Sequence, residues 1–390
     1  MVKTLHVVCL QVPYPPDYGG AIDMYYKLLA LKRLGYRILL HTYAYRHAPH
    51  REALAAVADE VRYYRRDESL RSACSLLPYI ISSRRDPRLL PDLLADDAPI
   101  LFEGLHTCGL LAHPSLAGRV KLVRMHNVEH RYYRHLALAT RHPLRALFFW
   151  VESVRLKRAE RLLRHADVVL PLSASEADYF RRRYAPWGVD VRLLPCFFRQ
   201  GGPVGPERGG GGFVLYQGNL SVAENVRAVR FILRRVAPLL PDAAFVIAGS
   251  HPGEALLRAA SAVANVRVVA DPTDEAMSRL LSEARVNLLL TFQSTGVKLK
   301  LLNALRQGAY CVANSPMVEG TGVESLCFVA DGAESIARSV RRALSRPYTP
   351  AFHRRKLALL DALYSNDRSA AIIEAAIREE EKKKIRPTNE

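Results

Sequence analysis

The sequence predicts two doubly wound α/β domains, each built around a mostly parallel sheet, and three observations support this fold class. Short apolar runs typical of strands alternate with longer segments of helical periodicity. In each half, glycine follows the first strand where a helix begins, at Gly19-Gly20 and at Gly218. The segment 199–212 (RQGGPVGPERGGGG) has the composition of a flexible linker and divides the 390 residues almost in half.

The linker sets the expected domain boundaries. We expect an N-terminal domain over 1–198, the linker over 199–212, a second domain over 213–349, and C-terminal helices with a basic tail over 350–390. The last helix ends in Glu-Glu-Glu-Lys-Lys-Lys, which we expect to be solvated and frayed.

Composition argues against several classes of protein. Hydrophobic residues make up 49% of the chain, but no run approaches the roughly 18 apolar residues that a membrane span needs. The N-terminal stretch MVKTLHVVCLQVPYPP lacks a small-residue cleavage site and reads as a first strand. The six cysteines form no CxxC pair, so we expect neither zinc nor a disulfide framework, and a reducing cytosol fits best. The net charge of +18 attracts nucleic acid, anionic lipid or phosphorylated substrates.

The N-terminal half reads as a series of strand–helix–strand units. A strand at 4–10 leads to a helix from Ala21 to Leu34, and a return strand follows at 37–43. The pair Gly19-Gly20 at the helix start is either a simple tight turn or a place of close approach to the backbone. Further strands are expected at 60–63, 100–103, 121–124 and 167–172.

Polar residues follow two of these strands directly, where a parallel sheet presents its ligand site. Glu103 ends one strand and either contacts an acceptor hydroxyl or forms an ion pair. The segment Arg124-Met-His-Asn-Val-Glu-His130 begins at the end of the next strand, and from spacing alone His126 is most simply a structural histidine. His126 and His130 offer two metal ligands without an evident third, so we expect no metal site.

The segment 131–164 is strongly basic, with nine Lys and Arg against two Glu, and contains Leu147-Phe-Phe-Trp150. Basic residues mixed with leucines and aromatics suit an anionic membrane surface. They also suit single-stranded nucleic acid, whose bases stack on aromatic rings. In the third interpretation, Phe148, Phe149 and Trp150 pack into the core while the arginines face water.

The second half contains two loops between strand and helix. A strand at 213–217 is followed by the loop from Gly218 to Asn225 and then by a helix. A strand at 286–290 is followed by a break at 293–296, and a second helix then runs to Gly308.

The start of the second helix is a possible anion site. Ser294 or Thr295 can cap it, and Gly296 lets another group approach the backbone closely. The free N–H groups of the first turn favour an anion, and Lys298 adds a full positive charge. Alternatively, Lys298 and Lys300 are merely solvated.

These segments resemble the GT-B retaining glycosyltransferases of family 4. Asn303-Ala-Leu-Arg-Gln-Gly308 matches the family's Glu-Ala-x-x-x-Gly helix end, and Tyr310-Cys-Val312 matches the following strand. The loop 218–225 is similar to the family's Gly-x-Leu…Lys-Asn loop. The opening Pro-x-Pro-x-x-x-Gly-Gly and the segment 124–130 also have counterparts in the family.

The chain departs from the family at the charged positions of the donor site. Thr295 and Asn303 replace the family's Glu-x7-Glu pair. Asn219 stands where Arg is common, and Glu224 where Lys is common, so a phosphate clamp loses two positive charges and gains a repulsive one.

The departures lead to three expectations about the helix after the break. Lys298 should stand in for a lost clamp residue. Asn303 should still bond ribose hydroxyls through its amide. Lys300 should point to a different face of the helix.

The resemblance implies a role for each matched residue. The catalytic candidate is His126, which lines the reacting sugar. The donor-binding candidates are Gly19, Gly20, Gly218, Asn219, Asn225, Thr295, Gly296, Lys298 and Asn303. The acceptor-side candidates are Glu103, Arg124, Glu129 and His130.

The function implied is transfer of a sugar from a nucleotide-sugar donor to a glycan or lipid-linked acceptor, with retention of configuration. The two domains would face each other across a cleft, and no metal or other cofactor would be required. A role in cell-surface polysaccharide or glycolipid biosynthesis follows, in the cytoplasm and peripherally associated with the inner face of the cell membrane. The expected partners are the donor, the acceptor and an anionic membrane surface.

Two alternatives remain open on sequence. The lost carboxylates and clamp residues also fit a catalytically impaired pseudo-glycosyltransferase that acts as a binding or scaffold subunit. The charge alone would fit a nucleic-acid-binding protein, but no RRM, KH or zinc-finger pattern supports that class.

Overall fold

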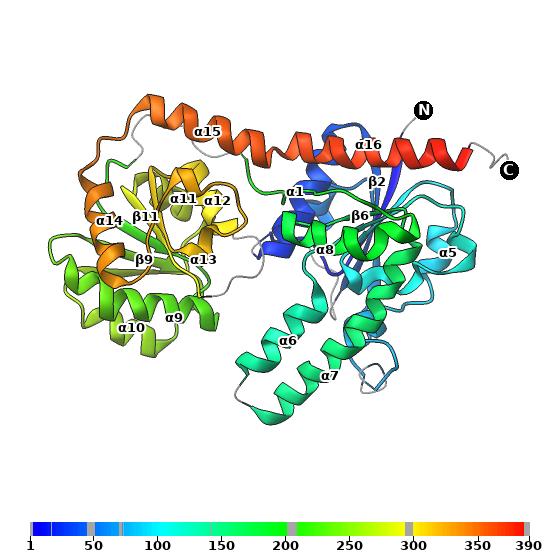
Figure 1. Cartoon of the computed structure of the whole chain (residues 1–390), viewed down its shortest axis with the longest axis horizontal. Helices are drawn as coiled ribbons and strands as arrows, with labels where there is room; N and C mark the ends of the chain where they lie inside the picture. The colour runs from blue at the N-terminus through cyan, green and yellow to red at the C-terminus, as the bar shows by residue number, and fades with distance from the viewer. Residues whose placement is uncertain are drawn as a thin grey trace. The chain divides into compact units, whose positions relative to one another are not determined.

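The computed structural model describes residues 3–16, 18–44, 51–69, 72, 74–140, 142–200, 209–292 and 299–385. The chain divides into two compact units (Figure 1). The first unit comprises Met1–Phe198 and Asn366–Glu390, and the second comprises Arg199–Ser365.

The first unit is built on a seven-stranded parallel sheet of order β3-β2-β1-β4-β5-β6-β7. Its strands are β1 (Lys3–Cys9), β2 (Tyr36–Ala44), β3 (Glu60–Arg65), β4 (Ile100–Glu103), β5 (Lys121–Arg124), β6 (Val168–Leu170) and β7 (Asp190–Val191). The expected strands are therefore confirmed, with the one at 167–172 shortened to β6. The strand order reverses at β1, between β2 and β4, and such switch points bind ligands at the carboxyl edge of a sheet.

Helices cover both faces of this sheet. The α-helices are α1 (Gly19–Arg33), α2 (Arg51–Ala55), α4 (Tyr79–Ser82), α5 (Leu89–Leu93), α6 (Glu129–Ala139), α7 (Pro143–Ala159), α8 (Ala174–Tyr184) and α16 (Asn366–Ile385). The 3₁₀ helices are η1 (Leu105–Leu110), η2 (Pro114–Leu116), η3 (Glu160–His165) and η4 (Ala185–Trp187). The interior-facing side chains form two separate apolar clusters.

The second unit has a six-stranded parallel sheet of order β10-β9-β8-β11-β12-β13. Its strands are β8 (Val214–Gln217), β9 (Phe245–Gly249), β10 (Val266–Ala270), β11 (Val286–Leu289), β12 (Tyr310–Ala313) and β13 (Cys327–Val329). The order again reverses, here at β8 between β9 and β11. Each unit is thus doubly wound, as predicted.

The helices of the second unit include a π-helical turn, η5 (Ile232–Val236), that directly continues α9. The α-helices are α9 (Ala223–Phe231), α10 (Glu254–Ser261), α11 (Asp274–Glu283), α12 (Leu299–Gln307), α13 (Ser315–Val318), α14 (Ala333–Ser345) and α15 (Pro350–Tyr364). The 3₁₀ turns are η6 (Ala237–Leu239) and η7 (Glu324–Leu326). Among the described residues, no helix combines the length and apolar character needed to cross a bilayer.

The C-terminal helices differ from expectation because they do not form one separate segment. Helix α15 lies in the second unit, whereas α16 packs against α1 in the first. Ile373 and Ile377 of α16 are buried in the core of the first unit. The charged end is also held, since Lys384 Nζ lies 3.0 Å from Asp167 Oδ2. The expected fraying is therefore wrong as far as Ile385, the last residue described.

Candidate functional site

Four charged side chains are buried at the carboxyl edge of the first sheet. They are Asp23 and Lys27 from α1, Glu103 at the end of β4, and Arg124 at the end of β5. Lys27 Nζ lies 2.9 Å from both Asp23 Oδ2 and Glu103 Oε1. Burial alone would raise the pKa of both carboxyl groups, but the positive charge of Lys27, with Arg124 beside Asp23, lowers both pKa values. The two acids are therefore ionised at neutral pH.

Arg124 uses all of its N–H groups within the protein. Its Nε and Nη2 donate to the Asp23 carboxylate at 3.1 and 3.0 Å. Its Nη1 donates to the backbone oxygens of Leu170 and Leu194, and its second Nη2 hydrogen points to Pro195 O. A guanidinium group has five N–H donors, so none is left for an acceptor. The structure thus gives this acceptor-side candidate a positioning role.

His126 is held by the same cluster. Its Nε2 lies 3.1 Å from Glu103 Oε2, and its side chain is 11% exposed while that of Glu103 is fully buried. Glu103 therefore forms the ion pair that was one of its two expected roles, and it also orients the imidazole. Gly104 follows at φ +74°, a conformation that favours glycine, and a Cβ there would lie 2.9 Å from His106 Nδ1 and 3.4 Å from His126 Cδ2.

A metal ion would fit this cluster poorly. Ligand atoms of Asp23, Glu103 and His126 all lie within 4.8 Å of one another. However, Lys27 and Arg124 already neutralise the two carboxylates, so a further buried cation would meet repulsion. That the protein needs no metal stays a prediction.

The remaining acceptor-side candidates, Glu129 and His130, begin helix α6. Glu129 is buried, burial raises the pKa of its carboxyl group to about 8, and Oε1 has no hydrogen-bond partner among the described residues. His130 Nδ1 lies 3.1 Å from Glu160 Oε1, which joins α6 to the turn after α7. Glu129 is therefore a neutral acid at pH 7, a state that the sequence did not predict.

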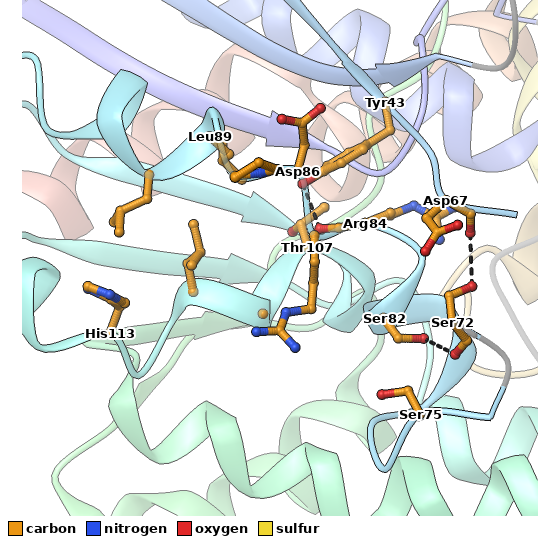
Figure 2. A pocket seen from close by; sticks show the side chains of 15 residues that line it. Tyr43, Asp67, Ser72, Ser75, Ser82, Arg84, Asp86, Leu89, Thr107 and His113 are labelled. Atoms are coloured by element: carbon orange, nitrogen blue, oxygen red, sulfur yellow. Dashed lines mark hydrogen bonds between the residues drawn. The ribbon is translucent and has the colours of Figure 1, made fainter. Parts of the chain in front are cut away.

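A polar pocket of about 580 Å³ opens in the first unit (Figure 2). Its wall comes from the end of β2, the segment 67–90 and the turn η1 that follows Glu103. Tyr43 donates to the backbone oxygen of Arg84, and Arg84 Nε donates to Leu10 O just after β1. The side chains that face it are mostly hydrogen-bonding groups, among them Asp67, Ser82, Asp86 and Thr107. Local sequence patterns did not reveal this pocket, because its lining residues are spread over 71 positions from 43 to 113.

Gly19 and Gly20 are the first residues of α1 and lie beyond the carboxyl end of β1. Asp23 and Lys27 follow on the same helix within two turns. That the glycine pair faces the donor diphosphate stays a prediction.

In the second unit, the loop from Gly218 to Asn225 is closed by its last side chain. Asn225 Nδ2 donates to Asn219 O at 2.9 Å, and Asn225 Oδ1 accepts from the Tyr216 hydroxyl at 3.1 Å. The neighbouring strand end also needs glycine, because a Cβ on Gly249 would lie 1.8 Å from Gly218 O. The loop is thus fixed at the switch point between β9 and β11.

Lys300 of α12 places a positive charge on this loop. Its Nζ lies 3.1 Å from Asn225 Oδ1 and 5.1 Å from the centre of the Tyr216 ring. The contact of Lys300 with this loop was not expected, whereas its expected position on a different face of the helix from Lys298 stays a prediction, because Lys298 lies outside the described residues. The sequence could not show this, because the contact joins residues 75 positions apart.

Glu224 has a structural use. Its Oε1 accepts hydrogen bonds from Thr291 Oγ1 at 2.9 Å and from the backbone N–H of Phe292. The carboxylate therefore fastens the first turn of α9 to the end of β11. The sequence predicted only its repulsion toward phosphate.

Three donor-site candidates, Thr295, Gly296 and Lys298, lie outside the described residues. Asn303 lies one helical turn after Lys300, so the two share a side of α12. Its Oδ1 is buried and has no hydrogen-bond partner among the described residues. An orphaned buried acceptor is costly unless a ligand or water satisfies it.

Two residues with left-handed backbone mark the edge of the same sheet. His251 has φ 54° and follows β9, and Asp271 has φ 44° and follows β10. The His251 N–H donates to Asp271 Oδ1 at 2.7 Å. Such conformations are uncommon outside glycine and cluster at functional sites. The sequence patterns did not single out His251.

Comparisons with known proteins agree with this geometry. Residues 212–346, which span β8 to α14, match the family model described as glycosyl transferases group 1. A sucrose-phosphate synthase from Thermosynechococcus elongatus superposes with a TM-score of 0.70 at 14% identity, covering 98% of this chain and all of that one. An α,α-trehalose-phosphate synthase from Burkholderia vietnamiensis gives 0.66 at 14% identity, covering 97% and 99%.

The fold is of the GT-B type. The family match further supports a group 1 glycosyltransferase. A protein of Klebsiella pneumoniae described as "Uncharacterized 44.6 kDa protein in cps region" is 26% identical over 338 residues, 81% of this chain and 84% of its own length.

Proposed function

We propose that the protein is a glycosyltransferase that moves a sugar from a nucleotide-sugar donor to a glycan or lipid-linked acceptor with retention of configuration. The observation that carries the proposal is the contact of Lys300 with the loop 218–225 at the switch point of the second sheet. This loop, β11 and α12 all lie inside the segment that matches the glycosyl transferase family.

The donor diphosphate would bind at the start of α9. The first N–H groups of a helix favour an anion, and Lys300 adds a full charge beside them. Glu224, the acid in that first turn, is engaged by Thr291 and Phe292. Lys300 would thereby replace a clamp charge that the loop itself lacks.

The ribose would bind next to the diphosphate. Asn303 lies on the same side of α12 as Lys300, and its buried amide oxygen has no partner among the residues that the structure describes. A ribose hydroxyl donating to Oδ1 would satisfy it. This arrangement explains how the donor site could work without the usual pair of carboxylates.

On the first unit, His126 would line the site of the reacting sugar. The imidazole is partly exposed and is oriented by Glu103, whose carboxylate forms an ion pair with Lys27. Hydrogen bonds and ion pairs behind a catalytic side chain hold it within the small range of positions and angles that turnover requires. The chemistry requires no metal if Lys300 and the helix N–H groups stabilise the departing diphosphate.

The acceptor would be recognised on the first unit. The polar pocket beside η1 offers hydroxyl, carboxylate and guanidinium groups, which suit the hydroxyls of a glycan. The description of the K. pneumoniae relative refers to a cps region, which supports a role in cell-surface polysaccharide or glycolipid biosynthesis.

Release of nucleoside diphosphate from UDP-, GDP- and ADP-sugars tests the proposal. We expect turnover with one donor, strongly reduced in both Lys300→Ala and His126→Ala. Tight donor binding without any release, across a panel of glycan and lipid-linked acceptors, would instead favour a pseudo-glycosyltransferase. The replacement of both carboxylates, at Thr295 and Asn303, is the observation behind that second candidate.

A further inference from the structure

Helices α6 and α7 form an antiparallel pair that projects from the sheet of the first unit (Figure 1). We call residues 129–159 the hairpin. Tyr133 and Phe149 pack against each other between the helices, with ring centres 5.9 Å apart. The hairpin thus has an internal contact of its own, and most of its remaining surface is open.

The open surface of the hairpin is unusually apolar. Seven of the seventeen exposed large hydrophobic side chains in the described part of the chain lie here: Tyr132, Leu138, Leu144, Leu147, Phe148, Trp150 and Val154. Leu138 is 78% exposed, Leu144 71% and Trp150 59%. The interpretation that places Phe148 and Trp150 in the core is therefore wrong for both residues. Exposed apolar side chains gathered on one element mark an interaction surface.

These apolar positions lie at helical spacing. Leu144, Leu147 and Val154 are separated by three and seven residues and form one stripe along α7. Trp150 and Phe148 border the stripe, and Leu138 lies near the end of α6, close to the connection with α7. The exposed apolar side chains of α7 therefore lie along one side of that helix, and Leu138 adds another near the end of α6.

The charge exposed beside this stripe has one sign. All carboxylates of the segment 129–161, namely Glu129, Glu152 and Glu160, are buried. Six exposed basic side chains have no carboxylate within ion-pair distance among the described residues: Arg131, Arg134, Arg145, Lys157, Arg158 and Arg161. The hairpin consequently presents leucines, aromatics and positive charge to its surroundings, and no exposed negative charge.

We propose that the hairpin docks on the surface of an anionic lipid bilayer. The leucines and Trp150 would enter the boundary between headgroups and acyl chains, and the arginines would pair with lipid phosphates. Nucleic acid would match the charge and could stack on Trp150, but it has no counterpart for the exposed leucines. The membrane is thus the partner whose charged headgroup region matches the arginines of the hairpin and whose acyl-chain region matches its leucines.

Vesicle binding of the full chain tests the proposal without any need for turnover. The probes are vesicles of phosphatidylcholine alone and of phosphatidylcholine with about one-third phosphatidylglycerol, a content that gives a negative surface potential. We expect binding to the anionic vesicles only, weakened by added salt. Equal binding to both, or binding to neither, would overturn the proposal.

Two hairpin variants separate the apolar contribution from the charge. Leu144→Ser with Leu147→Ser, and Arg145→Glu with Arg158→Glu, change only exposed side chains, and each pair should lower vesicle affinity at least tenfold. The controls in the second unit are Leu239→Ser with Leu257→Ser, at positions that are 42% and 38% exposed, and Arg234→Glu with Arg235→Glu, which change the net charge by the same amount at exposed positions. Equal losses in variants and controls would mean that the hairpin is not the contact.

Fluorescence reports the depth of insertion directly. The chain has two tryptophans, so Trp187→Phe leaves Trp150 as the only indole. Its emission should shift to the blue on adding anionic vesicles. No shift, or tighter binding to single-stranded RNA than to vesicles at the same salt, would contradict docking on a membrane.

Discussion

Lys300 Nζ lies 3.1 Å from Asn225 Oδ1, and this contact joins α12 to the loop after β8. The loop itself carries Asn219 and Glu224 where related donor sites carry basic residues, yet the contact restores one positive charge. The charge comes from a helix on the other side of the switch point, because α9 leads from β8 to β9 whereas α12 leads from β11 to β12. Two strand ends therefore build the candidate phosphate site together.

Lys300→Ala should weaken binding of a nucleoside diphosphate. A hydrogen bond to a charged group contributes ~1.5–3 kcal/mol, so we expect a loss of that size. Calorimetric titration of the wild type and the variant measures it. Lys300→Arg is the control that keeps the charge and should lose less. Unchanged affinity in Lys300→Ala would remove this residue from the donor site.

Asn303→Ala should affect the ribose and spare the diphosphate. The buried Oδ1 would lose one neutral hydrogen bond, worth ~0.5–1.5 kcal/mol. A 2′,3′-dideoxy nucleotide supplies the matched comparison, because it lacks the donating hydroxyls. The wild type should discriminate against the dideoxy nucleotide, and the variant should not. Equal discrimination by both proteins would show that Asn303 does not contact the ribose.

His126→Ala should abolish turnover but change the thermal stability of the protein only slightly. Within the described part of the chain, the imidazole makes one hydrogen bond, to Glu103, and Glu103 keeps its ion pair with Lys27 when that bond is lost. Loss of about 1 kcal/mol in a unit of this size shifts the thermal midpoint by only about 2–4 °C. Thermal unfolding and diphosphate release on the same preparations decide the matter. A collapsed fold, or normal activity, would each refute the assignment.

Glu129→Gln should stabilise the protein at high pH. Burial raises the pKa of this carboxyl group from about 4.5 to about 8, so between those values the folded chain binds one more proton than the unfolded chain. The stability of the wild type should fall as pH rises through that window and level off above it. The variant has no such proton, so its advantage in thermal midpoint should grow from pH 5 to about pH 9. An advantage that does not vary with pH would mean that Glu129 is not buried as a neutral acid.

Local patterns predicted the elements of the fold well, because strands and helices follow from hydrophobic period and glycine position. The strands at 100–103 and 121–124 came from short apolar runs, and both end on the polar residues that build the first cluster. His126 was placed correctly beyond β5 for the same reason.

Contacts between distant segments were not predictable in this way. The period of a helix assigns Lys300 to a face but does not reveal which loop lies opposite. Arg124 looked like a site residue, yet the oxygens that satisfy it belong to α1 and to segments 46 to 71 positions later. Glu129 was expected on the acceptor side, and nothing in the local pattern showed that its carboxyl group is buried. In each case, the local pattern did not show which residues, distant in the sequence, surround the side chain.

Calorimetric titration of the full chain with UDP, GDP, ADP and their sugars at millimolar concentration tests the central claim most directly. We predict saturable heat with at least one nucleoside diphosphate, reduced in Lys300→Ala and unchanged in the exposed-site control Arg234→Glu with Arg235→Glu. The absence of heat with every nucleotide would contradict a nucleotide-sugar site in the second unit and with it the proposed transferase activity.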